Sequence, residues 1–386
     1  MKAYTHAIDV LLKACTPDGF LASTKNQDNY ARVWTRDGVV CGLAALSSGN
    51  AELIKGFKNT LETIFAFQHP VGYFPSNVTP HNKQVSYGGA VGRTDNPSWA
   101  IIGLCLYLKQ NPNEEMKTRL KSQVEKAFWV LDAWEFNGKH LIYVPLSGDW
   151  ADEYCQHGYI LFDQLLRVWA LELASEIYKN KFWDLKAQQI RGVLEANYYS
   201  DLVQYSMFLP LLNREKSNYP KKYWLMGFNP GQIYPQFDLQ ANALAVYLKL
   251  GSSQTTQKLL DYCYELAAEK QSLLPSFHPS ITESDSQMPV LRNNYAYTFR
   301  NLPNQFHNGG LWPVWNGFFL AAIKNKHPQL ELELKNQLHT LCATGIDSKW
   351  EFNECFDGET NEPNGLPFCS WSAAGLILAE KGFYEN

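Results

Sequence analysis

Residues 159–174 read YILFDQLLRVWALELA, a run that places apolar side chains on nearly every side of a helix. A helix of this kind has no broad polar face to turn toward water, so neighbours must bury it on all sides. Five more stretches share this character: VVCGLAAL (39–46), WAIIGLCLYL (99–108), ANALAVYLKL (241–250), WNGFFLAAI (315–323) and WSAAGLILAE (371–380). The sequence therefore predicts six buried helices at the centre of the molecule.

The segments between these runs also have helical periodicity, but they carry a polar stripe. AELIKGFKNTLETIF (51–65) and NEEMKTRLKSQVEKAF (113–128) are examples. One-sided helices coat a core rather than fill it. Together the two kinds predict twelve helices, at residues 2–15, 38–48, 50–68, 96–109, 113–135, 158–179, 182–198, 238–250, 253–270, 311–325, 328–345 and 369–381.

The outer and inner helices alternate along the chain, which predicts six helical hairpins. Six hairpins packed side by side form an all-α (α/α)6 toroid, a six-hairpin barrel with minor β-hairpins in its loops. Short strands are expected near 140–145 and 203–209. An open helical solenoid is the rival, but a solenoid should repeat a consensus sequence and this chain shows none. Length alone allows two domains, yet the pattern favours a single domain spanning 1–386.

The composition is that of an ordinary globular protein. Apolar residues make up 45% and charged residues 19%, with a net charge of -4 and no basic run, so no nucleic-acid partner is expected. No apolar run reaches the ~18 residues that span a membrane. The N-terminal stretch reads as an amphipathic helix rather than a signal peptide. We expect a cytoplasmic protein, with signal-less export left open, and the sequence does not indicate an oligomeric state.

Metal and cofactor motifs are missing from the sequence. The eight cysteines form no C-x-x-C pair, and the nine histidines form no H-x-x-x-H or H-E-x-x-H pattern. The chain also has no phosphate loop and no G-x-G-x-x-G nucleotide fingerprint. A metal site is therefore the weaker explanation for the acidic residues, and we expect no metal and no cofactor.

The segments that lead into the six buried helices are rich in polar and aromatic residues, whereas the links that leave them are short. In a toroid these six segments open on one face, so their side chains should converge on one pocket. The six segments are NYARVWTRDG (29–38), YGGAVGRTDNPSW (87–99), LSGDWADEYCQHG (146–158), GFNPGQIYPQFD (227–238), YTFRNLPNQFHNGGLWP (297–313) and WEFNECFDGETNEPNG (350–365).

Five carboxylates in these segments are candidates for chemistry: Asp37, Asp95, Asp149, Asp152 and Glu354. Hydrolysis of an acetal needs one carboxyl kept protonated and one kept ionised. An inverting enzyme separates the two by ~6.5–9.5 Å, which leaves room for a water. Loops on opposite sides of a toroid mouth provide that gap. The loops before the third and sixth inner helices are candidates for such a facing pair.

Each of these residues also has a structural interpretation. Asp37 and Asp95 stand where the following helices need N-caps. Arg36 and Arg93 could form structural ion pairs instead of gripping sugar hydroxyls or carboxylates. Glu354 lies among apolar neighbours in the sequence, and a carboxylate in that setting is either paired or functional. We favour a functional role for Glu354.

Aromatic residues could form a sugar site. The chain has 12 Trp and 21 Tyr, and the apolar faces of a pyranose stack on flat rings. Core packing must account for most of these rings. We expect Trp34, Trp150 and Trp312, which lie in the rich loops, to bind substrate. His307 either binds substrate or is a satisfied core histidine.

Several motifs resemble those of the six-hairpin glycosidases, above all glycoside hydrolase family 100, the alkaline/neutral invertases. FHNGGLWP (306–313) resembles that family's YHNGGSWP, ECFDG (354–358) its EYYDG, and WSAAG (371–375) its WSIAG. AVGRTD (90–95) is similar to a stretch that ends in VDSG. The matches run in patches from about 29 to 380, in the same order.

Two other motifs are similar to related families. WTRDG (34–38) resembles the glucoamylases of family 15, and WAD (150–152) resembles the WMD of glycogen debranching enzymes. The invertase motif PIEIQAL corresponds to ILFDQLL (160–166), in which the family's Glu is lost. The resemblance therefore leaves open both sucrose and maltooligosaccharide or glycogen as substrates.

The resemblance assigns roles residue by residue. The family's base matches Glu354. Its acid lies in MVDRRMG, for which the best match is Asp152 in ADEY (151–154), although the Arg-Arg is absent and Asp149 stays a rival. The residues expected to hold the sugar in the -1 subsite are Arg36, Asp37 and Asp95. The resemblance also implies inversion of the anomeric centre and no cofactor.

The sequence thus predicts an inverting, exo-acting glycoside hydrolase that cleaves an α-glucosidic bond, with Asp152 as general acid and Glu354 as general base. One alternative is a sugar epimerase or isomerase on the same toroid. Such enzymes move a proton at carbon, usually with histidines, and only His157, His278 and His307 lie in or near the rich loops. Another alternative is a non-catalytic sugar-binding protein.

Overall fold

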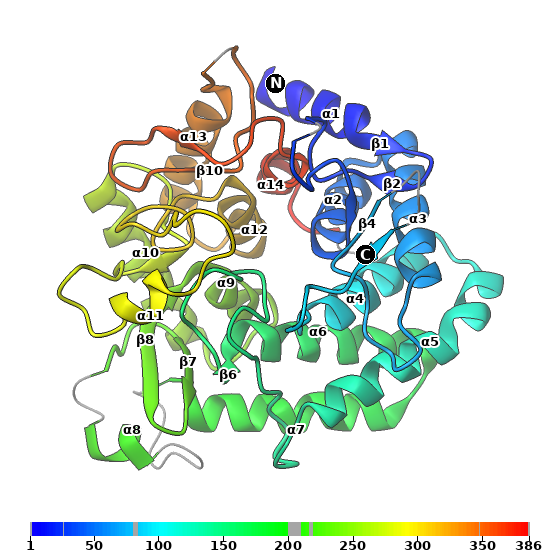
Figure 1. The fold of residues 1–386 in the computed structure, drawn as a ribbon, viewed down its shortest axis with the longest axis horizontal. Helices are drawn as coiled ribbons and strands as arrows, with labels where there is room; N and C mark the ends of the chain where they lie inside the picture. Colours follow the sequence, from blue (N-terminus) through cyan, green and yellow to red (C-terminus); the bar gives the residue numbers. More distant parts are fainter. Residues whose placement is uncertain are drawn as a thin grey trace.

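Six apolar helices form the centre of the computed structural model, which describes residues 2–25, 27–79, 84–199, 210–215, 219–346 and 348–384 (Figure 1). Every residue of α12 is buried, as a helix without a polar face requires. The six inner helices are α2 (Thr35–Ser48), α4 (Asn96–Gln110), α6 (Leu161–Tyr178), α9 (Leu239–Tyr247), α12 (Pro313–Ala322) and α14 (Ser370–Lys381).

These inner helices contact one another in chain order, and the order closes on itself. α2 contacts α4, α4 contacts α6, and α6 contacts α9. α9 in turn contacts α12, α12 contacts α14, and α14 returns to α2. An open solenoid would lack the last of these contacts. The predicted all-α class with minor strands is confirmed.

The outer helices lie around this ring, as Figure 1 shows. In α3, the residues Leu53, Phe57, Leu61 and Ile64 are all 0% exposed and recur every three or four positions, so one face packs inward. Each such side chain contributes about 1.5–3 kcal/mol by its burial. The outer helices are α1 (Lys2–Ala14), α3 (Ala51–Ala66), α5 (Glu114–Ala133), α7 (Lys181–Asn197), α10 (Ser253–Lys270) and α13 (Pro328–Ala343).

All twelve predicted helices are therefore present, with two short additions, α8 (Pro210–Glu215) and α11 (Met288–Arg292). Polar caps begin several outer helices. Asn50, Asn113, Asn180 and Ser252 each accept a hydrogen bond from a backbone N–H in the first turn of the helix that follows. These caps stand at the ends of the short links, so the chain turns there within a few residues.

Short antiparallel strands stiffen the long loops. β3 (Val33–Trp34), β4 (Asn77–Val78) and β5 (Val85–Ser86) form one sheet before α4. A second sheet joins β6 (Tyr159–Ile160), β7 (Leu225–Asn229), β8 (Gln232–Asp238) and β9 (Phe277–His278) in that order. β10 (Cys355–Phe356) pairs with β11 (Pro363–Asn364), and β1 (Cys15–Thr16) pairs with β2 (Gly19–Phe20).

The predicted strand near 140–145 is wrong. Only Val144 makes a β-bridge there, to Gly158, because the Gln164 side chain occupies both backbone groups of Ile142. The hairpin of β7 and β8 was missed, since 227–238 was expected to be a loop. Its strands are joined by the two-residue turn 230–231. The predicted strand at 203–209 lies outside the described residues.

One carboxamide arrangement recurs at the fourth residue of three inner helices. Asn316 in α12 accepts from the N–H of Leu274 and donates to its carbonyl, both at 2.9 Å. Asn242 in α9 binds Trp224 in the same way at 3.0 and 3.2 Å. Gln164 in α6 binds Ile142 at 2.9 Å twice. Each amide thereby fastens the incoming chain to the start of an inner helix.

The backbones of α12 and α14 approach very closely. A methyl group added at Gly317 would overlap the Gly375 carbonyl, and one added at Gly375 would lie 2.5 Å from the Pro313 carbonyl oxygen. Only glycine fits at this crossing. Separately, no helix in the described parts of the chain has the length and apolar character needed to cross a membrane.

We predict that Gly317→Ala destabilises the fold by about 1–3 kcal/mol or more, because the methyl group forces α12 away from α14. Gly192→Ala is the matched control. Gly192 also lies inside a helix, α7, but a methyl there meets nothing within 4 Å. This control should stabilise by about 0.5–1 kcal/mol through helix propensity. Thermal unfolding midpoints test both, and equal shifts in the two variants would refute the close crossing.

Candidate active site

The loops before the inner helices meet through ion pairs and hydrogen bonds. Arg36 Nη1 lies 2.7 Å from Asp95 Oδ2, which joins the start of α2 to the start of α4. Arg93 Nη2 lies 2.7 Å from Asp152 Oδ2, which joins the loop before α4 to the loop before α6. We call residues 146–158, which contain Asp152, the acid loop. These two contacts join the loops before the first, second and third inner helices.

Glu354 connects the sixth loop to the first. The Tyr30 hydroxyl donates to Glu354 Oε1 at 2.8 Å and lies 3.0 Å from Oε2. Burial raises the pKa of Glu354 to about 7, while the Tyr30 hydrogen bond and the Arg300 charge pull it back. The Glu354 N–H donates to the Leu366 carbonyl, which fixes the backbone. Glu354 is therefore a buried carboxyl poised between its ionised and protonated forms near pH 7.

Asp152 and Asp149 differ sharply in their environments. The Asp152 side chain is 38% exposed and pairs with Arg93. Asp149 is 1% exposed, and its two oxygens accept from the Ala151 N–H at 2.9 Å and from Gln156 Nε2 at 2.6 Å. Burial raises the pKa of Asp149 to about 7. Asp152 can meet a ligand, whereas Asp149 is enclosed by protein groups.

Neither Asp37 nor Asp95 acts as an N-cap through its side chain. α2 begins at Thr35, so Asp37 lies within its first turn and Trp34 is the N-cap. Asp95 does occupy the N-cap position of α4, but its side chain makes no capping bond and pairs with Arg36 instead. Burial raises the pKa of Asp37 to about 6, and the neighbouring Arg36 lowers it. Arg36, Asp37 and Asp95 therefore form one buried polar group.

The predicted aromatic residues are packed more deeply than expected. Trp150 is 2% and Trp312 is 1% exposed, and their rings meet edge to face at 5.3 Å. His307 stacks on Trp312 at 5.5 Å, and burial together with nearby arginines holds its pKa well below the usual value. Trp34 is half-buried, and its Nε1 donates to the Asn29 carbonyl. Trp150, Trp312 and His307 form a wall of packed rings rather than open platforms.

Two charged or polar residues of this site were missed from the sequence, Tyr30 and Arg300. Tyr30 holds Glu354, as described above. Arg300 lies 3.8 Å above the Phe306 ring and 3.3 Å from Glu153 Oε2. Both residues lie in or at the ends of the rich loops, so the loop pattern was a signal for them. Their roles depend on partners 324 and 147 positions away, which no local motif reveals.

Buried acids also lie beside the ring of inner helices. Asp163 in α6 accepts from the Thr94 hydroxyl at 2.7 Å, and Asp238 caps α9 through the Ala241 N–H at 2.8 Å. Burial raises the pKa of both carboxyls well above the usual value. In each, Oδ2 is buried and has no hydrogen-bond partner among the described residues. Such unpaired atoms cost about 1–3 kcal/mol each, a cost that proteins accept at functional sites.

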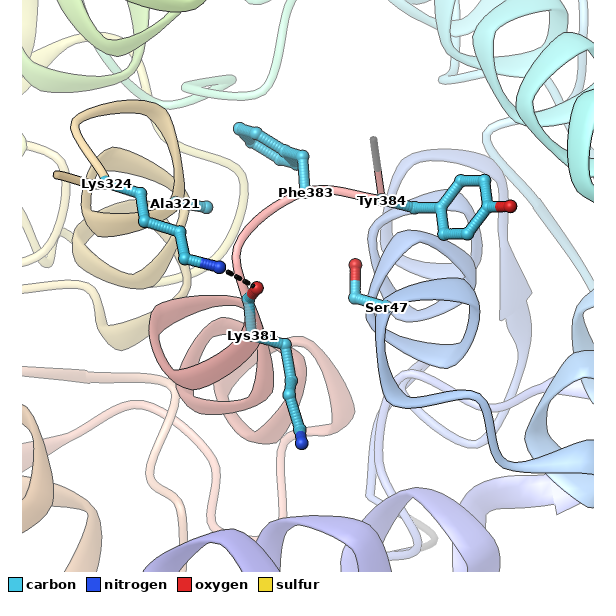
Figure 2. A pocket seen from close by; sticks show the side chains of 6 residues that line it. All are labelled: Ser47, Ala321, Lys324, Lys381, Phe383 and Tyr384. Atoms are coloured by element: carbon cyan, nitrogen blue, oxygen red, sulfur yellow. Dashed lines mark hydrogen bonds between the residues drawn. The ribbon is translucent and has the colours of Figure 1, made fainter. Parts of the chain in front are cut away.

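Two cavities lie outside this cluster. One, of about 390 Å³, lies between the acid loop and the β7–β8 turn, where His157 and Gln232 line it. The other, of about 270 Å³, lies at the C-terminal ends of α2, α12 and α14, away from the loops that precede these helices. Figure 2 shows that the Lys324 ammonium donates to the Lys381 carbonyl there. None of the described residues that line either cavity is acidic, so neither has the carboxyl pair that acetal hydrolysis needs.

Comparison with known proteins places this fold. No family model matches the chain. The chain is 23% identical to the probable alkaline/neutral invertase A, chloroplastic, of Arabidopsis thaliana, over 97% of this chain and 68% of that protein. A GH63 mannosylglycerate hydrolase of Thermus thermophilus superposes with a TM-score of 0.67 at 13% identity, covering 97% and 99% of the two chains.

A bacterial glucoamylase complexed with acarbose superposes with a TM-score of 0.60 at 14% identity, over 99% of this chain and 55% of that one. The fold is thus that of the six-hairpin glycosidases, and the resemblance predicted from the motifs is confirmed at this level. All three proteins are glycoside hydrolases by name. The particular reaction of this chain is a separate question.

We predict that Asp149→Asn flattens the pH dependence of stability. A carboxyl whose pKa is raised by folding, here from 3.8 to about 7, stabilises the fold below the unfolded pKa. That stability is lost as pH rises from about 4 to about 7. The amide keeps the acceptor for Ala151, and the unbonded Gln156 Oε1 can accept from it.

Thermal unfolding at pH 4, 5.5 and 7 tests this prediction. The midpoint of the wild type should fall relative to the variant as the pH rises. Parallel curves for the two proteins would show that Asp149 does not carry this proton.

Proposed function

We propose that residues 1–386 form a single (α/α)6 toroid that hydrolyses an α-glucosidic bond with inversion, with Asp152 as general acid and Glu354 as general base. One observation carries the proposal. Asp152 from the loop before α6 and Glu354 from the loop before α14 lie near a common group, because the charge of Asp152 acts on Arg36 and that of the adjacent Asp37 acts on Glu354. Arg93 holds Asp152, and Tyr30 holds Glu354. A glycosidase needs such a pair on either side of the scissile bond.

Glu354 suits the role of base. A base works best when its pKa lies near the operating pH, and burial brings the pKa of Glu354 to about 7. The Tyr30 hydroxyl spans both carboxylate oxygens and fixes the plane of the group. A water positioned by Glu354 would attack the anomeric carbon from the face opposite the leaving group.

Asp152 is the better acid because it can reach a ligand. Its side chain is 38% exposed, while both oxygens of Asp149 are already engaged. A general acid must be protonated when the substrate is bound, and a bound sugar that excludes water favours the neutral form of a carboxyl.

The remaining polar groups suit a single sugar ring. The Arg36 side chain is 9% exposed, is held by the fully buried Asp95 and lies 5.8 Å from the Trp371 ring. A guanidinium held in this way binds a hydroxyl with little loss of entropy. The similarity to an invertase and a glucoamylase supports an α-glucoside of a di- or oligosaccharide or a glucan as substrate, cleaved from one end.

We predict that the loss of activity depends on the leaving group in Asp152→Asn but not in Glu354→Gln. Asp152→Asn should lower kcat on maltose about 10²–10⁴-fold but act far less on α-glucosyl fluoride, because fluoride leaves without a proton. Glu354→Gln should abolish hydrolysis of both substrates, since each requires an activated water. The rate on each substrate and the anomer released, read by NMR, provide the test, and inversion requires the β-anomer from an α-substrate.

Glu362→Gln is the control, because Glu362 is an exposed acid in the same loop as Glu354. It should leave both rates unchanged. If Asp149→Asn instead of Asp152→Asn spared the fluoride, Asp149 would be the acid. An α-anomer product would overturn inversion.

We predict that Tyr30→Phe moves the acid limb of the pH–rate profile upward by about one unit. The Tyr30 hydroxyl lowers the pKa of Glu354 by hydrogen bonding, so its loss raises that pKa above about 7. Glu354 must be ionised to act as base, and activity at lower pH is therefore lost. Tyr178→Phe, which removes a hydroxyl bonded to the Lys117 carbonyl on the outer side, should leave the profile in place.

Substrate screening separates this proposal from its alternatives. Sucrose, trehalose, maltose, maltotriose, isomaltose and glycogen cover the bonds in question. An epimerase would return an isomer of the sugar with no bond broken, and a binding protein would bind without turnover. Either result would replace the hydrolase proposal.

A further inference from the structure

The acid loop is bonded to a second loop, residues 294–301, along its length. The Ser147 hydroxyl donates to Asn294 Oδ1 at 2.8 Å, and Asn294 Nδ2 donates to the Tyr154 carbonyl at 2.8 Å. Further along, Asn301 Nδ2 donates to the Glu153 carbonyl at 2.9 Å. The position of 294–301 is therefore set by the same loop that carries Asp152.

The side chain of Glu153, the residue after Asp152, adds to the contacts between these two loops. Its carboxylate pairs with Arg300, and the Ala296 backbone lies near enough to lower its pKa. Glu153 itself is only 8% exposed. Ala296 thus lies close to the residue next to the proposed acid.

Two tyrosines flank Ala296 and face solvent. Tyr295 is 46% exposed and Tyr297 is 94% exposed. The Tyr295 ring lies 5.9 Å from Phe299, which packs against the core and steadies it. In Figure 1 this segment runs, in yellow, near α11. This pair differs from the other exposed rings of the chain because its loop is bonded to the acid loop.

From this geometry we infer that Tyr295 and Tyr297 form a leaving-group surface, which binds an oligosaccharide chain beyond the sugar that directly follows the scissile bond. The inference rests on the proposed function, because a general acid protonates the leaving oxygen and the leaving group therefore lies against the acid loop. Aromatic rings stack on pyranose faces. A substrate with several sugar units thus fits this surface better than a disaccharide does.

The exposed fractions of Asp152 and Tyr297 indicate the order in which the substrate chain contacts them. The Asp152 side chain is 38% exposed, whereas Tyr297 is almost wholly in solvent. A single sugar beside Asp152 is held by the inner groups. Further units of the leaving chain extend outward along 294–301 and meet the tyrosines. The rings bind by their faces, so the hydroxyl groups are not required.

The double variant Tyr295→Ala/Tyr297→Ala tests this inference. We expect the ratio of kcat/KM for maltopentaose to that for maltose to fall about tenfold. The variant Tyr295→Phe/Tyr297→Phe should keep the wild-type ratio, because its ring faces remain. Phe136→Ala/Phe182→Ala is the matched control, since these rings are 75% and 81% exposed outside the site. This control should also keep the ratio.

The outcomes distinguish the inference from the proposed function. An unchanged ratio in Tyr295→Ala/Tyr297→Ala, with activity still dependent on Glu354, overturns the leaving-group surface alone. A wild-type enzyme that cleaves sucrose or maltose but not maltopentaose also overturns it and leaves the hydrolase intact. A wild type without hydrolytic activity on any of these sugars overturns the proposed function and, with it, the inference.

Discussion

Six helices without a usable polar face are the constraint on which the rest of this structure depends. Each must be covered on all sides, and a closed ring of six, wrapped by one-sided outer helices, covers them all. The arrangement leaves few positions along the inner helices for polar chemistry. Functional groups are therefore confined to the helix starts and to the loops that precede them.

Three carboxamides link this ring to the loops. Asn316, Asn242 and Gln164 stand at the fourth residue of their helices, and each satisfies both backbone groups of one residue in the incoming chain. Buried backbone groups outside regular structure need such partners. The loops are thus fixed without long strands. The device also explains why a region expected to be a strand at 140–145 makes only one bridge.

Burial also sets the electrostatics of the candidate site. The pKa of Glu354 and that of Asp149 rise to about 7 and that of Asp37 to about 6, in each case chiefly because the carboxyl is removed from water. Arginines oppose this effect where they approach. Arg93 pairs with Asp152, the most accessible of the predicted acids. Burial in the fold, rather than the chemistry of the side chain, thus raises these three pKa values.

The sequence by itself determined the helices and the face on which polar residues gather, because both follow from local periodicity and from the short links. It also singled out most of the residues in the candidate cluster. Only the tertiary structure decided that Tyr30 holds Glu354, that Arg300 meets Glu153, and that Trp150 packs inside a wall of rings. These facts depend on residues far apart in the chain. Periodicity indicates which face of a helix is buried. The partner of a loop side chain depends on which loops the closed ring of helices brings together.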